Sequence, residues 1–325
     1  MLRRCEKGLT EIAGIRVGHA SDREALTGCT VILCEQGAVA GADVRGSATG
    51  TEELLTMEPD HIAPHVHAVV LAGGSAFGLE AASGVRRWLE ARGIGFETGS
   101  ARVPIVPCAI IYDLAIGQPY VRPTREMGEA AAQAASDEPV EEGAVGAGTG
   151  ATVGKVLGMG HAMKSGIGSA CFQMPGSGVK VAALAVVNAF GDVVDPASGR
   201  IIAGARASAA GREFVDTPRL LMSGVRPSFA GASTTLIVVA TNAALSKVQA
   251  RKLAVLAGLG VARTIRPVNT PYDGDLVIAL ALGGERADLT ALGVAAAEAV
   301  SEAILRAVQM APSLGGVPGL KSWSD

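Results

Sequence analysis

The chain has 325 residues with 28 basic and 31 acidic side chains, a net charge of −3, and only 3% aromatic residues. Because it has neither a basic stripe nor aromatic residues on which bases could stack, the composition argues against a nucleic-acid-binding protein. No apolar run approaches the roughly 20 residues that span a bilayer, and the N-terminal stretch lacks the apolar core of a signal peptide, so we expect a cytoplasmic protein without membrane contact.

The composition also limits how the core can be built. Hydrophobic residues make up 49% of the sequence and 43 residues are glycine, so Ala, Val, Leu and Ile must supply most of the core. A chain of this length can bury enough apolar surface to fold without disulfides. The five cysteines are scattered and include no C-x-x-C pair, which favours reduced thiols over a disulfide framework or a zinc site.

Predicted strands and helices alternate along the chain. Apolar runs predict buried strands, and residues recurring on one face predict helices between them. Gly258 is expected to cap the third helix at its C-terminus. This alternation predicts an α/β fold; an αββα sandwich of two adjacent sheets fits the Gly and Ala content, and the pattern also fits a doubly wound sheet. The predicted strands are 30–33, 67–73, 181–191, 234–241 and 275–282, and the predicted helices are 78–93, 125–135, 245–258 and 288–310.

A glycine-rich segment, "GAVGAGTGATVGK" at 143–155, resembles a phosphate-binding loop but lacks its spacing. A P-loop requires a glycine where Thr149 stands and a Ser or Thr where Val156 stands, and the dinucleotide fingerprint fails at Ala151. Nucleotide binding is therefore not expected. Lys155, which ends the segment, is either a solvated surface lysine or a functional group.

Metal and serine-hydrolase signatures are also missing. His61 and His65 have a metal-ligand spacing, but Pro64 between them argues against a helix that presents both. "GGSAFGL", which begins at Gly73, does not match the G-x-S-x-G elbow. It is better explained as a strand-to-helix turn whose backbone amides could face an anion.

Three consecutive hydroxyls stand where a long connection, 204–233, meets an apolar strand: Ser233, Thr234 and Thr235. The connection contains small residues such as Gly231 and Ala232, and structureless loops of this length are uncommon unless they are functional or disordered. A hydroxyl nucleophile needs a base, and the only suitable base without a partner histidine is the residue's own α-amine. That amine exists only after the preceding peptide bond is cut. The alternative is that the threonines merely begin a β-strand, which threonine favours.

Polar residues flank two other predicted strands. Asp273 and Asp275 bracket Gly274 before one strand, and their alternation places both on one side. Asn188 lies towards the end of another. These residues are either ordinary turn residues or the groups that orient an amine nucleophile and bind an oxyanion.

The sequence resembles the DmpA/BapA peptidase family over nearly its whole length. That family includes L-aminopeptidase/D-amidase enzymes, β-peptidyl aminopeptidases and nylon-oligomer hydrolases. The resemblance implies an αββα sandwich similar to N-terminal nucleophile hydrolases, with the strand connectivity of this family. The motifs that carry it are "GIRVGHA", "VLAGGSAFGLEAASGVRRWLEARGIGF", "VPIVPCAIIYDL", "GAGTGATVGK", "LAVVNAFGDVVDP" and "STTLIVVATNAALSKVQARKLA".

The resemblance implies a role for each candidate residue. The nucleophile corresponds to Thr234, so a single domain of residues 1–325 would cut itself at Ser233–Thr234 into chains 1–233 and 234–325. These chains would stay together, commonly as a tetramer of αβ units. The remaining matches are Asp273 and Asp275 as the acidic pair of the nylon-hydrolase branch, Asn188 as the oxyanion-side asparagine, Lys155 as the lysine beside the nucleophile, and Tyr112 as the active-site tyrosine.

One departure concerns the substrate. The segment before Tyr112, "PCAII", lacks the acidic residue that holds the substrate's amino group in β-peptide aminopeptidases. We therefore predict a self-processing amidohydrolase that acts on small peptides or amide oligomers, needs neither metal nor organic cofactor, and does not require a free-amine substrate. The alternatives are a non-cleaving assembly protein of the same fold and an acyltransferase that uses the same acyl-enzyme.

Overall fold

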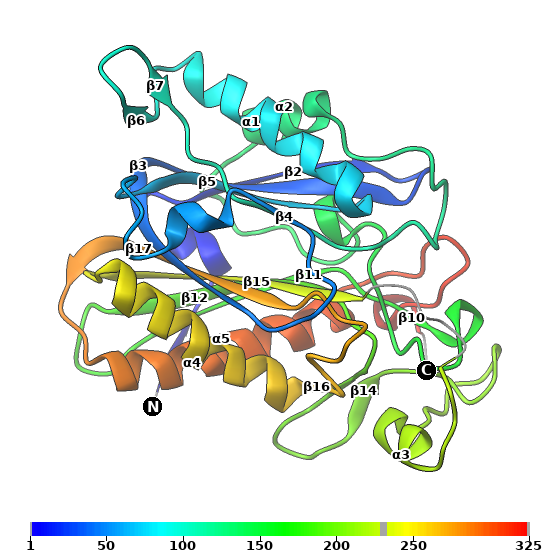
Figure 1. Ribbon diagram of the computed structural model, residues 1–325. Helices are drawn as coiled ribbons and strands as arrows, with labels where there is room; N and C mark the ends of the chain where they lie inside the picture. Colours follow the sequence, from blue (N-terminus) through cyan, green and yellow to red (C-terminus); the bar gives the residue numbers. More distant parts are fainter. Residues whose placement is uncertain (1, 228–232, 324–325) are drawn as a thin grey trace.

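A computed structural model describes residues 2–227 and 233–323. Its strands form two sheets that share one long strand, β3 (Thr27–Val44). The first part of β3 pairs with β2 and β5, and its last residues pair with β17. The lower sheet in Figure 1 has the strand order β1 (Arg3–Cys5), β11 (Ile167–Gln173), β12 (Lys180–Asn188), β15 (Thr234–Ala243), β17 (Leu276–Glu285) and the end of β3. The upper sheet contains β2 (Arg16–Asp22), the start of β3, β5 (Val66–Ala72), β8 (Cys108–Ile110) and β4 (Thr51–Glu52).

Helices cover the outer face of each sheet. In Figure 1, α1 (Ala81–Glu90) and α2 (Arg125–Gln133) lie over the upper sheet, and α4 (Lys247–Thr264) and α5 (Leu289–Gln309) lie under the lower one. The layers therefore follow the order helix, sheet, sheet, helix, which confirms the predicted αββα sandwich. The shorter elements are α3 (Thr217–Met222) and the strands β6 (Phe96–Glu97), β7 (Arg102–Val103), β9 (Thr152–Val153), β10 (Met163–Lys164), β13 (Asp192–Val194), β14 (Ile201–Ala203) and β16 (Ile265–Arg266).

Strand β15 shows why continuous apolar runs suit this architecture. Successive side chains of a strand point to opposite faces. Leu236 and Val238 enter the core between the two sheets, whereas Ile237 and Val239 pack on the side of α4 and α5. Both faces of Leu236–Ala240 are buried, which explains why this middle part of the strand is apolar at every position.

Two expectations about local structure were wrong. Helix α4 does not end at Gly258 but continues to Thr264. Its next glycine, Gly260, serves helix packing, because a Cβ there would lie 2.3 Å from the carbonyl oxygen of Ala297 on α5. The connection at 204–233 is also not structureless: α3 lies within it, and the Asp216 side chain caps that helix by accepting the Arg219 N–H. Gly231 and Ala232 lie outside the described residues.

Candidate active site

The fold brings three strand ends together at one edge of the lower sheet. Thr234 is the first residue of β15 and pairs with Asn188, the last residue of β12. On the other side of β15 lies the parallel strand β17, which Asp275 directly precedes. Residues that are far apart in the sequence therefore converge because antiparallel and parallel neighbours start and end at the same edge. The sequence predicted these positions but could not supply the strand order.

The hydroxyl of Thr234 is buried and finds no hydrogen-bond partner among residues 2–227 and 233–323, and the same holds for the hydroxyl of Thr235. An unpaired buried hydroxyl costs about 1–3 kcal/mol, so its presence needs a reason. Gly274 lies directly against it: a Cβ at this position would be 2.8 Å from Thr234 Oγ1 and 2.7 Å from the carbonyl oxygen of Ala48. The glycine between the two aspartates therefore leaves the space that the hydroxyl occupies.

The peptide group before Thr234 is held firmly. Ser233 forms a parallel bridge with Asp273, and its N–H donates to the carbonyl of Tyr272 at 2.8 Å. Its own carbonyl oxygen accepts the N–H of Gly274 at 2.6 Å. The carbonyl next to the Thr234 hydroxyl thus receives a backbone hydrogen bond.

The two aspartates bind the backbone around Thr234. The Asp275 carboxylate accepts the N–H of Thr235 at 2.6 Å and that of Asn269 at 3.0 Å, while Asp273 Oδ2 accepts the N–H and the hydroxyl of Thr270 at 2.9 and 2.6 Å. Burial raises the pKa of both carboxyls. For Asp275, burial together with repulsion from Asp273 raises the pKa to about 7, so this group exchanges a proton near neutral pH.

Lys155 is not a solvated surface lysine, because only 1% of it is exposed. Its Nζ donates to the carbonyl oxygen of Asn188 at 2.9 Å, to Asn188 Oδ1 at 2.7 Å and to Ser233 Oγ at 3.3 Å. Burial lowers the pKa of Lys155 to about 7, against the opposing effect of the carboxylates of Asp273, Asp113 and Asp275. The glycine-rich segment therefore places the Lys155 ammonium group beside Asn188 and Ser233, and this group loses its proton near neutral pH.

The side-chain amide of Asn188 is fixed from both ends. Its Nδ2 donates to the carbonyl oxygen of Tyr112 at 2.9 Å, and its Oδ1 accepts from Lys155 and from the N–H of Thr152 at 3.1 Å. Tyr112 thus adjoins the site through its main chain, and its side chain is half-buried. All seven residues singled out from the sequence, Tyr112, Lys155, Asn188, Ser233, Thr234, Asp273 and Asp275, are linked by these contacts.

Sequence reasoning missed two buried charged residues behind this site. Lys164 is fully buried, and Asp113 is 4% exposed. Asp113 accepts the N–H of Gly74 at 2.6 Å and the hydroxyl of Thr27 at 2.8 Å, so the amide of the "GGSAFGL" turn faces an internal carboxylate. The only sequence signal for Lys164 was a lysine among small and apolar residues, as for Lys155.

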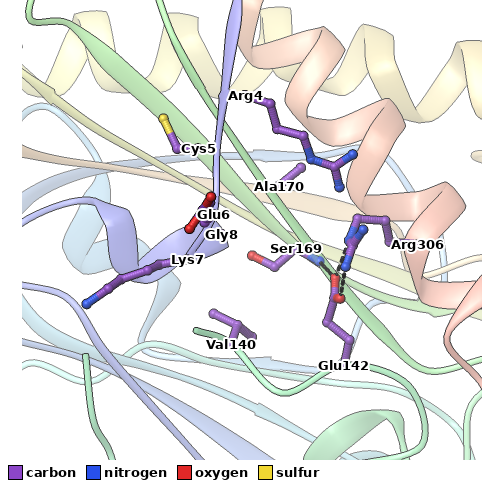
Figure 2. Close-up of a pocket in the computed structure, with 10 residues that line it drawn as sticks. All are labelled: Arg4, Cys5, Glu6, Lys7, Gly8, Val140, Glu142, Ser169, Ala170 and Arg306. Carbon is purple, nitrogen blue, oxygen red and sulfur yellow. Dashed lines mark hydrogen bonds and ion pairs between the residues drawn. The ribbon is translucent and has the colours of Figure 1, made fainter. Parts of the chain in front are cut away.

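A cavity of about 400 Å³ lies elsewhere, beside β1 and β11 (Figure 2). Its charged groups include Arg306, which pairs with Glu142, while Glu142 also accepts the N–H of Ser169. Ser169 lies opposite Leu184, on the side of β12 that faces away from β15. The cavity is therefore separate from the Thr234 site, and these groups satisfy one another.

Two further observations bear on the expected chemistry. Among residues 2–227 and 233–323, no three His, Cys, Asp or Glu side chains are grouped as metal ligands, and the Nδ1 of His67 instead accepts the N–H of Ile105 at 3.1 Å. None of the helices in these same ranges combines the length and apolar character needed to cross a membrane.

Comparison with known proteins gives consistent matches over the whole chain. A model described as peptidase family S58 matches residues 7–322. The chain is 40% identical to an uncharacterized aminopeptidase of Mycobacterium tuberculosis, over 95% of this chain and 96% of the relative. It is 31% identical to a 6-aminohexanoate-oligomer endohydrolase of Kocuria sp., over 92% of this chain and 85% of that enzyme.

Solved structures agree with the observed architecture. A β-aminopeptidase of Burkholderia sp. matches with a TM-score of 0.69 at 24% identity, covering 97% of this chain and 91% of its own. An L-aminopeptidase D-Ala-esterase/amidase of Ochrobactrum anthropi, described as a variant of the Ntn hydrolase fold, matches with a TM-score of 0.70 at 20% identity, covering 96% and 88%. At these identities the likeness confirms the fold.

Proposed function

Because the chain belongs to peptidase family S58, we propose that it is a self-processing amidohydrolase whose nucleophile is the hydroxyl of Thr234. The chain is a hydrolytic enzyme of the peptidase and amidohydrolase class, since both its family and its relatives act on amide bonds. The observation that carries the finer proposal is the position of Thr234, whose buried hydroxyl finds no partner in the described part of the chain and directly follows a Ser233 carbonyl that already accepts a backbone N–H.

Self-processing begins when Thr234 Oγ1 attacks the carbonyl carbon of Ser233. The C–N bond of the Ser233–Thr234 peptide breaks, an ester forms between the Ser233 carbonyl and Thr234 Oγ1, and the amine of Thr234 is released. Water then hydrolyses the ester and leaves chains 1–233 and 234–325. The N–H of Gly274, which donates to this carbonyl oxygen at 2.6 Å, steadies the negative charge that develops there.

The first step needs a base other than the Thr234 nitrogen, which is an amide in the uncut chain. Lys155 suits this role because its Nζ contacts Ser233 and Asn188 and because burial lowers its pKa to about 7. A neutral fraction of Lys155 therefore exists near neutral pH, and it takes the hydroxyl proton directly or through water.

In the mature enzyme the freed amine of Thr234 takes over as the base for substrate hydrolysis. Asp273 and Asp275 orient this amine, and Asn188 with neighbouring backbone amides steadies the substrate oxyanion. Lys155, when charged, favours the neutral form of the amine by repulsion. Tyr112 contributes to the substrate side of the site.

The proposed substrates are small peptides or amide oligomers that need not carry a free amine near the scissile bond. Residues 108–111, which precede Tyr112, are buried and apolar, so they offer no carboxylate to hold a substrate ammonium. The Asp-Gly-Asp arrangement supports a specificity nearer the oligomer hydrolases than the aminopeptidases. We further infer that the two chains stay associated, as a tetramer of αβ units, in the cytoplasm.

Two matched variants test the nucleophile. Thr234→Ala should remain a folded single chain without amidase activity, whereas Thr235→Ala should still be cut, because the Thr235 nitrogen stays in a peptide bond. Denaturing gels report the cut, and product analysis with and without an amine acceptor distinguishes hydrolysis from acyl transfer. Cleavage of Thr234→Ala at the wild-type rate would refute the assignment.

A further inference from the structure

Lys164 is a buried cation that the proposed mechanism does not use. It is fully buried, and its Nζ donates to the carbonyl oxygens of Ala151 at 2.7 Å, Ser165 at 2.7 Å and Gly148 at 3.2 Å. Burial lowers the pKa of Lys164 to about 7, and its three carbonyl acceptors stabilise the charged form against this effect. Two of the three acceptors belong to the glycine-rich segment.

The segment that Lys164 holds forms one wall of the Thr234 site. Lys164 on β10 pairs with Thr152 on β9, directly after the Gly148–Ala151 turn. The Thr152 N–H donates to Asn188 Oδ1, and Lys155 follows three residues later with its own contacts to Asn188. A displacement of the turn would therefore move both donors that fix the asparagine amide.

Asp113 packs against the same turn. A Cβ at Gly150 would be 2.6 Å from Asp113 Cβ, so the turn packs directly on the aspartate. Asp113 follows Tyr112, whose carbonyl accepts from Asn188. The negative charge of Asp113 favours the protonated form of both Lys155 and Lys164, whereas Lys155 and Lys164 repel each other.

We propose that Lys164 and Asp113 are positioning residues for self-cleavage, which both contact the glycine-rich turn and hold it in place, and which influence the charge of Lys155 with opposite signs. The inference rests on the proposed function, because it takes neutral Lys155 as the base of the first step. The charged groups that act on Lys155 in the described chain are Asp273, Asp275, Asp113 and Lys164. Only the last two lie outside the machinery assigned above.

Because Lys164 and Asp113 carry opposite charges, removing one or the other should shift the pH profile of self-cleavage in opposite directions. Removing the Lys164 charge removes a repulsion, so the pKa of Lys155 should rise and a higher pH should be needed to obtain its neutral form. Removing the Asp113 charge removes an attraction, so the pKa of Lys155 should fall. A purely structural contribution would slow cleavage at every pH without moving the profile.

Two variants remove one charge each. Lys164→Met keeps the length of the side chain but leaves three carbonyls without their donor. Asp113→Asn is gentler, because the amide oxygen can accept the Gly74 N–H while the Thr27 hydroxyl turns to accept from the new NH₂ group. Lys252→Met, at an exposed position of α4, is the matched control.

The experiment follows self-cleavage of the full chain. Each chain is synthesised in a cell-free reaction and transferred to buffers on either side of neutral pH, and its two fragments are followed over time on denaturing gels. The midpoint of the rate profile should move up by on the order of 1 pH unit in Lys164→Met and down by a similar amount in Asp113→Asn, and should stay in place in Lys252→Met. Slower cleavage without opposite shifts would overturn the proposal.

Other outcomes are equally decisive. If Lys164→Met fails to fold, as judged by circular dichroism, the downward shift in Asp113→Asn decides alone, and an unmoved profile in that variant overturns the inference. If the wild-type chain never cleaves, the proposed function fails and the inference fails with it. If the wild type cleaves at a rate independent of pH, Thr234 remains the nucleophile, but the role of Lys155 as the base and the inference built on it are both overturned.

Discussion

Gly274→Ala tests whether the space beside Thr234 matters for the reaction. The new Cβ would lie 2.8 Å from Thr234 Oγ1 and 2.7 Å from the carbonyl oxygen of Ala48. Contacts of a Cβ below 3.0 Å essentially do not occur and ordinary contacts begin at 3.4 Å, so the surrounding atoms must move by at least about 0.2 Å, and by about 0.6 Å to restore ordinary contact with the hydroxyl. Overpacking of this kind costs about 1–3 kcal/mol of stability.

The effect on cleavage should be larger than the effect on folding. Misplacing a reacting group by about 1 Å costs on the order of 100-fold in rate, so a shift of about half that size should slow cleavage by roughly 10-fold or more. The assay is a time course of the two fragments on denaturing gels, with a thermal melt for stability. Gly284→Ala is the matched control on β17, because nothing lies within 4 Å of a Cβ there.

The reasoning would be refuted if Gly274→Ala were cut at the wild-type rate. It would also be refuted if Gly284→Ala were slowed as much, since that would indicate a general effect on β17.

Two further predictions concern the charged groups. Asp275→Asn should lower amidase turnover by about 100-fold or more, the usual contribution of an acid-base group, as measured with purified enzyme on amide substrates. The wild type should also lose stability relative to this variant as the pH rises from 3.8 to about 7, by up to about 1.4 kcal/mol per pH unit. The reason is that the folded carboxyl still holds a proton in this range, whereas the unfolded one has already lost it. Denaturant titrations measure this difference, and parallel pH profiles of the two proteins would contradict it. Lys155→Met should slow self-cleavage at neutral pH and abolish its rise with pH, and an unchanged gel time course would exclude Lys155 as the base.

The hydrogen bonds of Asp275 distinguish it from an ordinary turn residue. Asp275 accepts two N–H groups, from Thr235 and Asn269, through its two oxygens. An asparagine offers one carbonyl oxygen, so one of these amides would face an NH₂ group, at a cost of about 1–3 kcal/mol that does not vary with pH.

The sequence was sufficient for most of the central strands because strands buried on both faces leave continuous apolar runs; the pattern alone left a doubly wound sheet open, and the family resemblance implied the αββα layers. Runs at β5, β12, β15 and β17 were all recognisable for this reason. The role of β3 was not recognisable, because only its first part is a continuous apolar run. Its later residues pair with β17 and carry the chain from one sheet to the other, and this sharing is a property of tertiary structure.

Residues of the candidate site could be predicted from the sequence where a polar side chain stands at the end of an apolar strand. Hydroxyls before an apolar strand and paired aspartates around a glycine marked Thr234 and Asp275. Nothing local marked Asp113, because its partners Gly74 and Thr27 come from distant parts of the chain. Buried charges become visible only when the segments around them are assembled.

The most direct test of the central claim is the intact mass of purified, folded protein. Self-processing predicts two species, residues 1–233 and residues 234–325, with threonine at the N-terminus of the second. A new terminus at Ser233 would shift the nucleophile by one position. A single chain of full length after prolonged incubation would contradict the proposed mechanism.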